Sequence, residues 1–237
     1  MWLAARFGPN VPGRRRGLDQ AIREDFSVIV AATLTLLALI IGFSFSMAIT
    51  RYDQRKTYEE DEANAIGTEY LRADLLPAAD GANVRALLKR YVDQRILFYT
   101  IRDSEQLNEI SARTVRLQTE LWSAVKAPTI AQPTPLAALA VGGMNDALNS
   151  QGYTQAAWWN RIPVAAWGLM LAIAIASNVL IGYGVRDIKS EASLLLVLPL
   201  IVSIAFFLIA DIDSPRTGII RVIPQNLTSL AELLRAP

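Results

Sequence analysis

An uncharged stretch of 22 residues, 26–47, most constrains what this chain can fold into. As an α-helix it would rise about 33 Å, which is enough to cross a hydrocarbon core about 30 Å thick. The next proline is Pro77, so the helix can continue into the charged residues that begin at Arg51. The sequence therefore predicts one long helix, apolar in its first part and charged in its second, with Gly67 as its weakest point.

Two later stretches, within residues 162–185 and 192–211, are also apolar and long enough to span a bilayer. Asn178 is the one strongly polar residue of the first, and Pro199 predicts a kink in the second. Apolar residues make up 52% of the chain and are clustered in these stretches, which favours a membrane protein over a large soluble core. We expect a multi-pass protein of the bacterial plasma (inner) membrane, with transmembrane helices at 26–50, 162–185 and 192–211.

Residues 51–161 predict a helical domain outside the bilayer. We expect a turn at 77–83, a helix N-cap at Asp103 and a break around Pro128 to Pro135. Apolar positions recur there at spacings of three and four, as on helices that pack together: Val84, Leu87, Leu88 and Tyr91, then Leu107, Ile110, Thr114, Leu117, Leu121 and Ala124. The predicted fold class is all-α, an integral membrane protein with three transmembrane helices and an extramembrane helical bundle that continues from the first span. A basic N-terminal segment (1–25) and a C-terminal tail (212–237), with a short amphipathic stretch near its end, complete the chain.

Small side chains follow one face of the first span. Ala31, Thr35, Ala38, Gly42 and Ser46 succeed one another at spacings of three or four. Small faces allow close approach of membrane helices, so this face could line a pore or an oligomer contact, or pack against the other spans of the same chain. The candidate residues for a pore or helix-packing face are Ala38, Gly42, Ser46 and Asn178, the last of which we expect to hydrogen-bond across helices.

Two groups of charges lie next to the predicted spans. Glu59, Glu60, Asp61 and Glu62 form an acidic run, which is either a ring that attracts cations in an oligomer or a solvated helix face. Asp211, Asp213 and Arg216 follow the third span and could pair, sit in headgroups or handle ions. The candidate ion-attracting or pairing charges are Glu59, Glu60, Glu62, Asp211, Asp213 and Arg216.

The composition excludes several classes of chemistry. The chain contains neither cysteine nor histidine, which removes disulfides, thiol nucleophiles, histidine-based triads and His/Cys metal sites. The remaining carboxylates name no substrate, so we expect neither an enzyme nor a cofactor. With 23 basic and 22 acidic residues, the net charge of +1 provides no global field for nucleic acid.

Four segments resemble a known family. GFSFSMAITRYDQRKTYEEDEANAIGTEYLRADLLP (42–77), NRIP (160–163), YGVRD (183–187) and DIDSPRTGIIRV (211–222) are similar to the bestrophin-like family of bacterial membrane proteins. Bestrophins are pentameric anion channels with few spans and a helical domain that extends the pore. The resemblance implies a homo-oligomer in the lipid bilayer that acts as an ion channel or channel-like pore, with inorganic ions as partners. The alternative is a non-catalytic membrane scaffold or sensor whose helical domain binds a partner.

The distribution of basic residues gives little information about the orientation in the membrane. Basic residues flank the spans in equal number on the two sides, so the positive-inside rule does not decide. The arginine-rich first 25 residues favour the N-terminus inside, which would place the helical domain outside. Analogy with bestrophins would instead place that domain in the cytoplasm.

Overall fold

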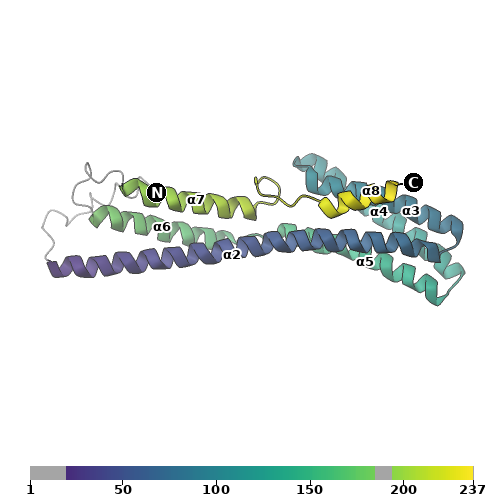
Figure 1. Cartoon of the computed structure of the whole chain (residues 1–237), viewed down its shortest axis with the longest axis horizontal. Helices are drawn as coiled ribbons and strands as arrows, with labels where there is room; N and C mark the ends of the chain where they lie inside the picture. The colour runs from purple at the N-terminus through teal and green to yellow at the C-terminus, as the bar shows by residue number, and fades with distance from the viewer. Residues whose placement is uncertain (1–19, 185–193, 237) are drawn as a thin grey trace. The chain divides into compact units, whose positions relative to one another are not determined.

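The computed structural model describes residues 20–184 and 194–236, and these are largely helical. Most of the basic N-terminal segment, as well as Arg186 and Lys189, therefore lies outside the described residues. The helices, shown in Figure 1, are α2 (Gln20–Arg72), η2 (Ala73–Leu75), α3 (Ala78–Thr100), α4 (Ser104–Ala131), α5 (Pro135–Trp159), α6 (Val164–Gly184), α7 (Leu194–Asp213) and α8 (Gln225–Arg235). The predicted all-α fold class is confirmed.

The long first helix is also confirmed. α2 runs for 53 residues without a break, from the apolar stretch through the acidic run to Arg72. Gly67 does not interrupt it. A Cβ at this position would lie 3.2 Å from Leu230 Cδ1 of α8, so the glycine permits close packing of the two helices.

Among residues 20–184 and 194–236, three helical segments are long and apolar enough to cross a membrane by length and composition. The most apolar window of α2 has a mean hydropathy of 2.5. The corresponding value is 2.1 for the segment Pro135–Gly184, which includes α6, and 2.3 for α7. Pro199 lies within α7, and that helix extends to Asp213. The described residues thus contain three candidate membrane spans, in agreement with the sequence.

The chain forms two compact units. Unit 1 consists of Met1–Thr50 and Arg161–Ser214, and unit 2 consists of Arg51–Asn160 and Pro215–Pro237. Helices α6 and α7 pack together in unit 1, whereas α3 packs against α4 and α8, and α4 against α5, in unit 2. We describe each unit by itself.

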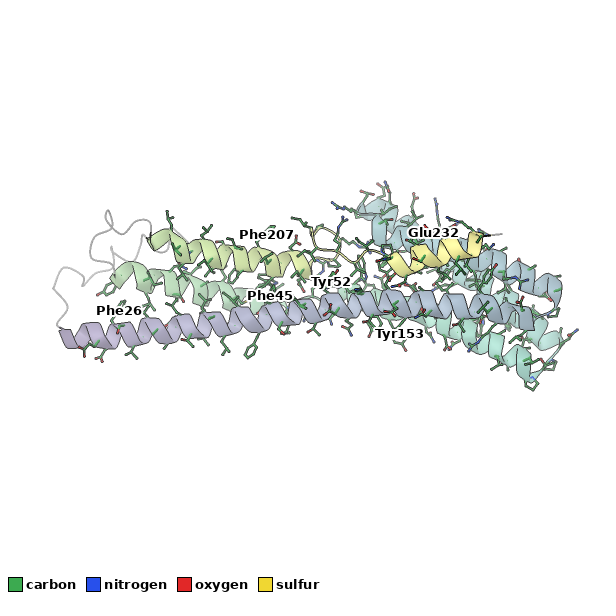
Figure 2. The ribbon with its side chains drawn as sticks, viewed as in Figure 1. Phe26, Phe45, Tyr52, Tyr153, Phe207 and Glu232 are labelled. Carbon is green, nitrogen blue, oxygen red and sulfur yellow. The ribbon has the colours of Figure 1, made fainter. Side chains whose placement is uncertain are left out.

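Unit 1 has a small core and a large apolar surface. Leu37, Ala174 and Val202 are its buried cluster. Many of its large hydrophobic side chains are exposed, including Phe45 of α2 and Phe207 of α7, which are labelled in Figure 2. Such a surface suits lipid rather than water.

Unit 2 has an extensive core. Both predicted stripes contribute to it, with Leu88, Tyr91 and Leu121 among the fully buried side chains. Leu227, Ala231 and Leu234 bury one face of α8, which packs against α3. The predicted amphipathic stretch of the C-terminal tail is therefore part of this bundle.

Of three local predictions in unit 2, one is largely wrong and two are confirmed. The turn expected over 77–83 is limited to its start, because α3 begins directly after Pro77. Gly81 belongs to that helix, and a Cβ there would overlap the Ala73 carbonyl oxygen. The break around Pro128 to Pro135 is confirmed and falls at residues 132–134, because α4 includes Pro128 and ends at Ala131 while α5 begins at Pro135. The Asp103 cap is confirmed, because its side chain accepts a hydrogen bond of 2.9 Å from Gln106 N.

Candidate functional site

Glu62 and Arg95 form an ion pair in the core of unit 2. Arg95 Nε donates to Glu62 Oε1, and Arg95 Nη2 lies 3.3 Å from Oε2. The hydroxyls of Tyr99 and Thr154 donate to the same Oε2 at 3.3 and 3.1 Å. Helices α2, α3 and α5 therefore converge on one carboxylate, whose hydrogen-bonding capacity is used by the protein itself.

The surroundings of the ion pair favour a charged Arg95 and an uncharged Tyr99. Burial by itself would lower the pKa of Arg95, but the charge of Glu62 and the hydrogen bond to it outweigh burial and raise that pKa. Burial and the charge of Glu62 also raise the pKa of Tyr99. Arg95 remains a cation and Tyr99 a neutral donor, as a structural ion pair requires.

Glu59 binds the N-terminal end of α8. Its Oε1 accepts a hydrogen bond of 2.9 Å from Leu227 N, and its Oε2 accepts one of 2.7 Å from Asn226 Nδ2. The first N–H groups of a helix lack intrahelical partners and carry partial positive charge, so a carboxylate stabilises them. Burial raises the pKa of Glu59, although these hydrogen bonds act in the opposite direction.

Two arginines of unit 2 donate hydrogen bonds to backbone carbonyl oxygens at the C-terminal ends of helices. Arg55 donates to the carbonyl oxygens of Ala157 at 3.2 Å and Asn160 at 3.3 Å, at the end of α5. Arg216 donates to Phe98 O at 3.0 Å and Ile101 O at 3.4 Å, at the end of α3. Its guanidinium carbon also lies 4.6 Å from the Phe98 ring centroid. These cations complement the negative ends of the helices they bind.

The acidic run thus divides between the inside and the outside of unit 2. Glu59 and Glu62 are buried, whereas Glu60 and Asp61 are exposed. The interpretation of the whole run as a solvated face is therefore wrong for Glu59 and Glu62, because their side of α2 faces the bundle. A ring of free carboxylates does not fit these two residues either. Glu60 stays a candidate ion-attracting charge.

The charges after the third span separate in the same way. Asp213 in unit 1 is buried, and its Oδ2 and Oδ1 accept hydrogen bonds from Ile162 N at 3.0 and 3.2 Å. This ties the residues before α6 to the end of α7. Asp211 is half-buried on the last turn of α7, and Arg216 binds α3 in unit 2. Their role as pairing or ion-attracting charges stays a prediction.

The small-residue face of α2 is exposed in unit 1. Ala38, Gly42 and Ser46 all lie on the surface, while Leu37 on another side of the helix is buried. A Cβ at Gly42 would have no heavy atom within 4 Å. Packing of this face against the other spans of the same chain, one of the two expectations, is therefore not observed. Its role as a pore or oligomer face stays a prediction.

Asn178 does not belong to that exposed face. It is buried in α6, and its Nδ2 donates a hydrogen bond of 2.7 Å to Ala174 O, one turn earlier in the same helix. This bond stays within α6, and the hydrogen bond across helices stays a prediction.

Sequence reasoning missed Arg55, Arg95 and Glu69 as interior residues. The sequence does contain a signal for the residues of α2. Its buried positions follow one another at alternating spacings of four and three, so they lie on one side of the helix. They are Arg55, Glu59, Glu62, Ile66 and Glu69. Arg95 likewise lies four residues after buried Tyr91. Charge usually marks the solvent side of a helix, so the sequence pattern alone places these residues on the outside.

The fold and these sites define a class of protein, a multi-span α-helical membrane protein with a helical bundle stabilised by buried charges. The Bestrophin-like domain model matches residues 4–227, so the chain belongs to the bestrophin-like family. The resemblance seen in the sequence is confirmed. No curated protein sequence matches the chain.

Solved structures of a bacterial bestrophin homolog from Klebsiella pneumoniae share the fold. One is 14% identical, with a TM-score of 0.69, and the match covers 100% of this chain and 97% of that chain. A single-residue variant of that homolog is 13% identical, with a TM-score of 0.70, over 98% of this chain and 94% of that chain. At these identities the likeness concerns the fold alone.

Proposed function

We propose that this protein is the subunit of a homo-oligomeric ion channel or channel-like pore in the plasma membrane. The observation that carries the proposal is the exposed small-residue face of α2 in unit 1. In the proposed assembly, Ala38, Gly42 and Ser46 face neighbouring subunits or the ion path. Membership of the bestrophin-like family and the fold shared with a bacterial bestrophin homolog support the same conclusion.

The size of the exposed side chains supports an assembly rather than a lipid contact at this face. Elsewhere in unit 1, exposed positions carry large apolar side chains such as Leu200 and Phe207 of α7. Small side chains bring helix backbones close together, which is how helices associate in lipid. An exposed face made of alanine, glycine and serine therefore favours another copy of the chain, or a water-filled axis, over acyl chains.

The exposed charges of α2 in unit 2 carry both signs. The exposed positions of α2 in this unit include Asp53, Lys56, Glu60 and Asp61. The carboxylates of Glu59 and Glu62 accept hydrogen bonds inside the bundle. The acidic run therefore offers fewer free carboxylates than its sequence suggests. Anions and cations are therefore both tested as permeant ions.

Subunit count and single-cysteine conductance together test the proposal. The native chain has no cysteine, so an introduced one is the only thiol. We expect a symmetric ring with an axial opening in detergent-solubilised particles. In liposomes or planar bilayers, a water-soluble thiol reagent should change the conductance of Gly42→Cys and Ser46→Cys. Leu200→Cys on the exposed surface of α7 is the matched control, and its conductance should not respond.

Two results would contradict the channel. One is the absence of conductance under every ion and voltage condition. The other is a monomer or a two-fold dimer without an axial hole, which would favour the scaffold or sensor. The apolar stripes within 84–124 offer a partner little free surface, because they are largely buried in the core of unit 2.

We further propose that the N-terminus is inside and unit 2 outside, on the basis of the arginine-rich first residues. Ser123 lies on the exposed surface of α4, so Ser123→Cys reports the side of the membrane. We expect a membrane-impermeant maleimide to label this variant in intact cells. Labelling only after permeabilisation would place unit 2 in the cytoplasm.

A further inference from the structure

Glu69 differs from the other buried acids of α2. It lies seven residues after Glu62 on the same inward side of the helix, and its side chain is fully buried. Glu59 and Glu62 each accept several hydrogen bonds. Among the described residues, in contrast, neither Oε1 nor Oε2 of Glu69 has a hydrogen-bond partner. A buried carboxylate without donors is costly, and native proteins rarely retain one without a reason.

The Glu69 carboxyl lies against a glycine of α5. A Cβ at Gly143 would overlap both Glu69 Oε2 and Arg72 Nη1, so the absence of a side chain makes room for these two groups. Arg72 is one turn further along α2, and its guanidinium makes no hydrogen bond to Glu69. The local packing of α2 on α5 therefore depends on a carboxyl group that is enclosed but not satisfied.

The charges around Glu69 come from α2 and α5. Arg72 of α2 favours its ionised form, and Asp146 of α5 disfavours it. Asp74 of η2, an element that also packs against α5, is paired with Arg85 of α3 at the surface. Burial is the largest influence and raises the pKa of Glu69 from 4.5 to about 8. The carboxyl is thus neutral at pH 7.

We propose that Glu69 is a proton-operated lock between α2 and α5. When it is protonated, the neutral carboxyl permits α5 to close on α2 at Gly143. When it is ionised, the two helices separate enough for water to reach it. The device belongs to unit 2 and does not depend on whether the protein conducts ions.

The direction of the pH dependence follows from linkage. Below about pH 4.5 the carboxyl is protonated in both the folded and the unfolded chain and contributes no difference. Between about 4.5 and 8 the unfolded chain ionises while the folded chain keeps its proton, so the free energy of unfolding falls as the pH rises. Above about 8 both forms are ionised and the loss is complete.

Infrared spectroscopy of the full chain in detergent tests the lock directly. The protonated-carboxyl carbonyl band should be present at pH 7, disappear with a midpoint near 8, and be absent from Glu69→Gln. Glu60→Gln, which removes an exposed acid from the same helix, should keep the band. A band with a midpoint near 4.5, or one that remains in Glu69→Gln, would overturn the proposal.

Hydrogen exchange of the wild-type chain provides a second readout that needs no variant to fold. Relative to amides of α4 far from this contact, amides of α5 around Gly143 should lose protection as the pH passes about 8. The same shift should be missing from Glu69→Gln where that variant folds. Protection around Gly143 that keeps a constant ratio to α4 from pH 6 to 9 would refute the lock even if the protein conducts ions normally.

Discussion

Leu200 of α7 and Leu121 of α4 illustrate how the two units differ. Leu200 is 61% exposed on the surface of unit 1, whereas Leu121 is fully buried in unit 2. Unit 1 leaves most of its apolar area outside and buries few side chains, since lipid is its solvent. Unit 2 buries its apolar side chains and, with them, charges that bind helix ends and one another.

The comparison predicts how strongly the loss of a side chain destabilises each unit. In unit 2, a removed side chain leaves a void or an unpaired charge that water cannot reach. In unit 1, an altered surface side chain is met by lipid, so we expect it to change folding little. Four sets of substitutions, in order of decreasing effect on stability, test this difference.

Breaking the buried ion pair should have the largest effect. Arg95→Met leaves Glu62 buried without its cation, which we expect to lower the free energy of unfolding by about 3–5 kcal/mol. Denaturant unfolding in detergent, followed by near-ultraviolet circular dichroism, measures the loss. The double variant Glu62→Gln/Arg95→Met removes both charges and should recover part of it. A single variant as stable as the wild type would contradict a structural role for the pair.

Truncation of the two leucines compares the units directly. Leu121→Ala creates a cavity in unit 2 and should cost about 2–5 kcal/mol. Leu200→Ala removes the same atoms from an exposed position and should change stability by no more than about 0.5 kcal/mol. The same denaturation experiment measures both. Equal losses would mean that α7 is buried as deeply as α4.

Removal of the carboxylate at the start of α8 should have a smaller, local effect. Glu59→Ala deprives Leu227 N of its acceptor, and we expect a loss of about 0.5–2 kcal/mol. Hydrogen exchange should rise selectively in α8. Glu60→Ala, at the exposed neighbouring position, is the control and should leave exchange in α8 unchanged.

Enlargement of the small-residue face should change stability least. Gly42 and Gly168 both have open space where a Cβ would lie, so either glycine accepts a larger side chain within the chain itself. We expect Gly42→Leu and Gly168→Leu to fold like the wild type, within about 0.5 kcal/mol. Only Gly42→Leu should alter the subunit number measured by native mass spectrometry. An unchanged oligomer in both variants would remove the small-residue face from the interface.

The candidate sites show where sequence reasoning stopped. Glu59, Glu62, Asp213 and Arg216 stood out as charges able to pair, yet none of their partners followed from the sequence. Glu62 binds Arg95 across 33 positions, and Glu59 binds Leu227 across 168. Such pairings depend on which helices become neighbours, and local periodicity carries no information about that.

The sequence by itself determined the membrane spans, the helical class and the continuous first helix. These properties follow from the length of apolar runs, the spacing of apolar residues and the position of the first proline after the span, all of which are local. Only the tertiary structure decided that Glu62 points inward while Glu60 points outward, that Glu69 faces Gly143 without a hydrogen bond, and that the face of Gly42 remains open. A helix presents every direction equally, so its neighbours determine which side is buried.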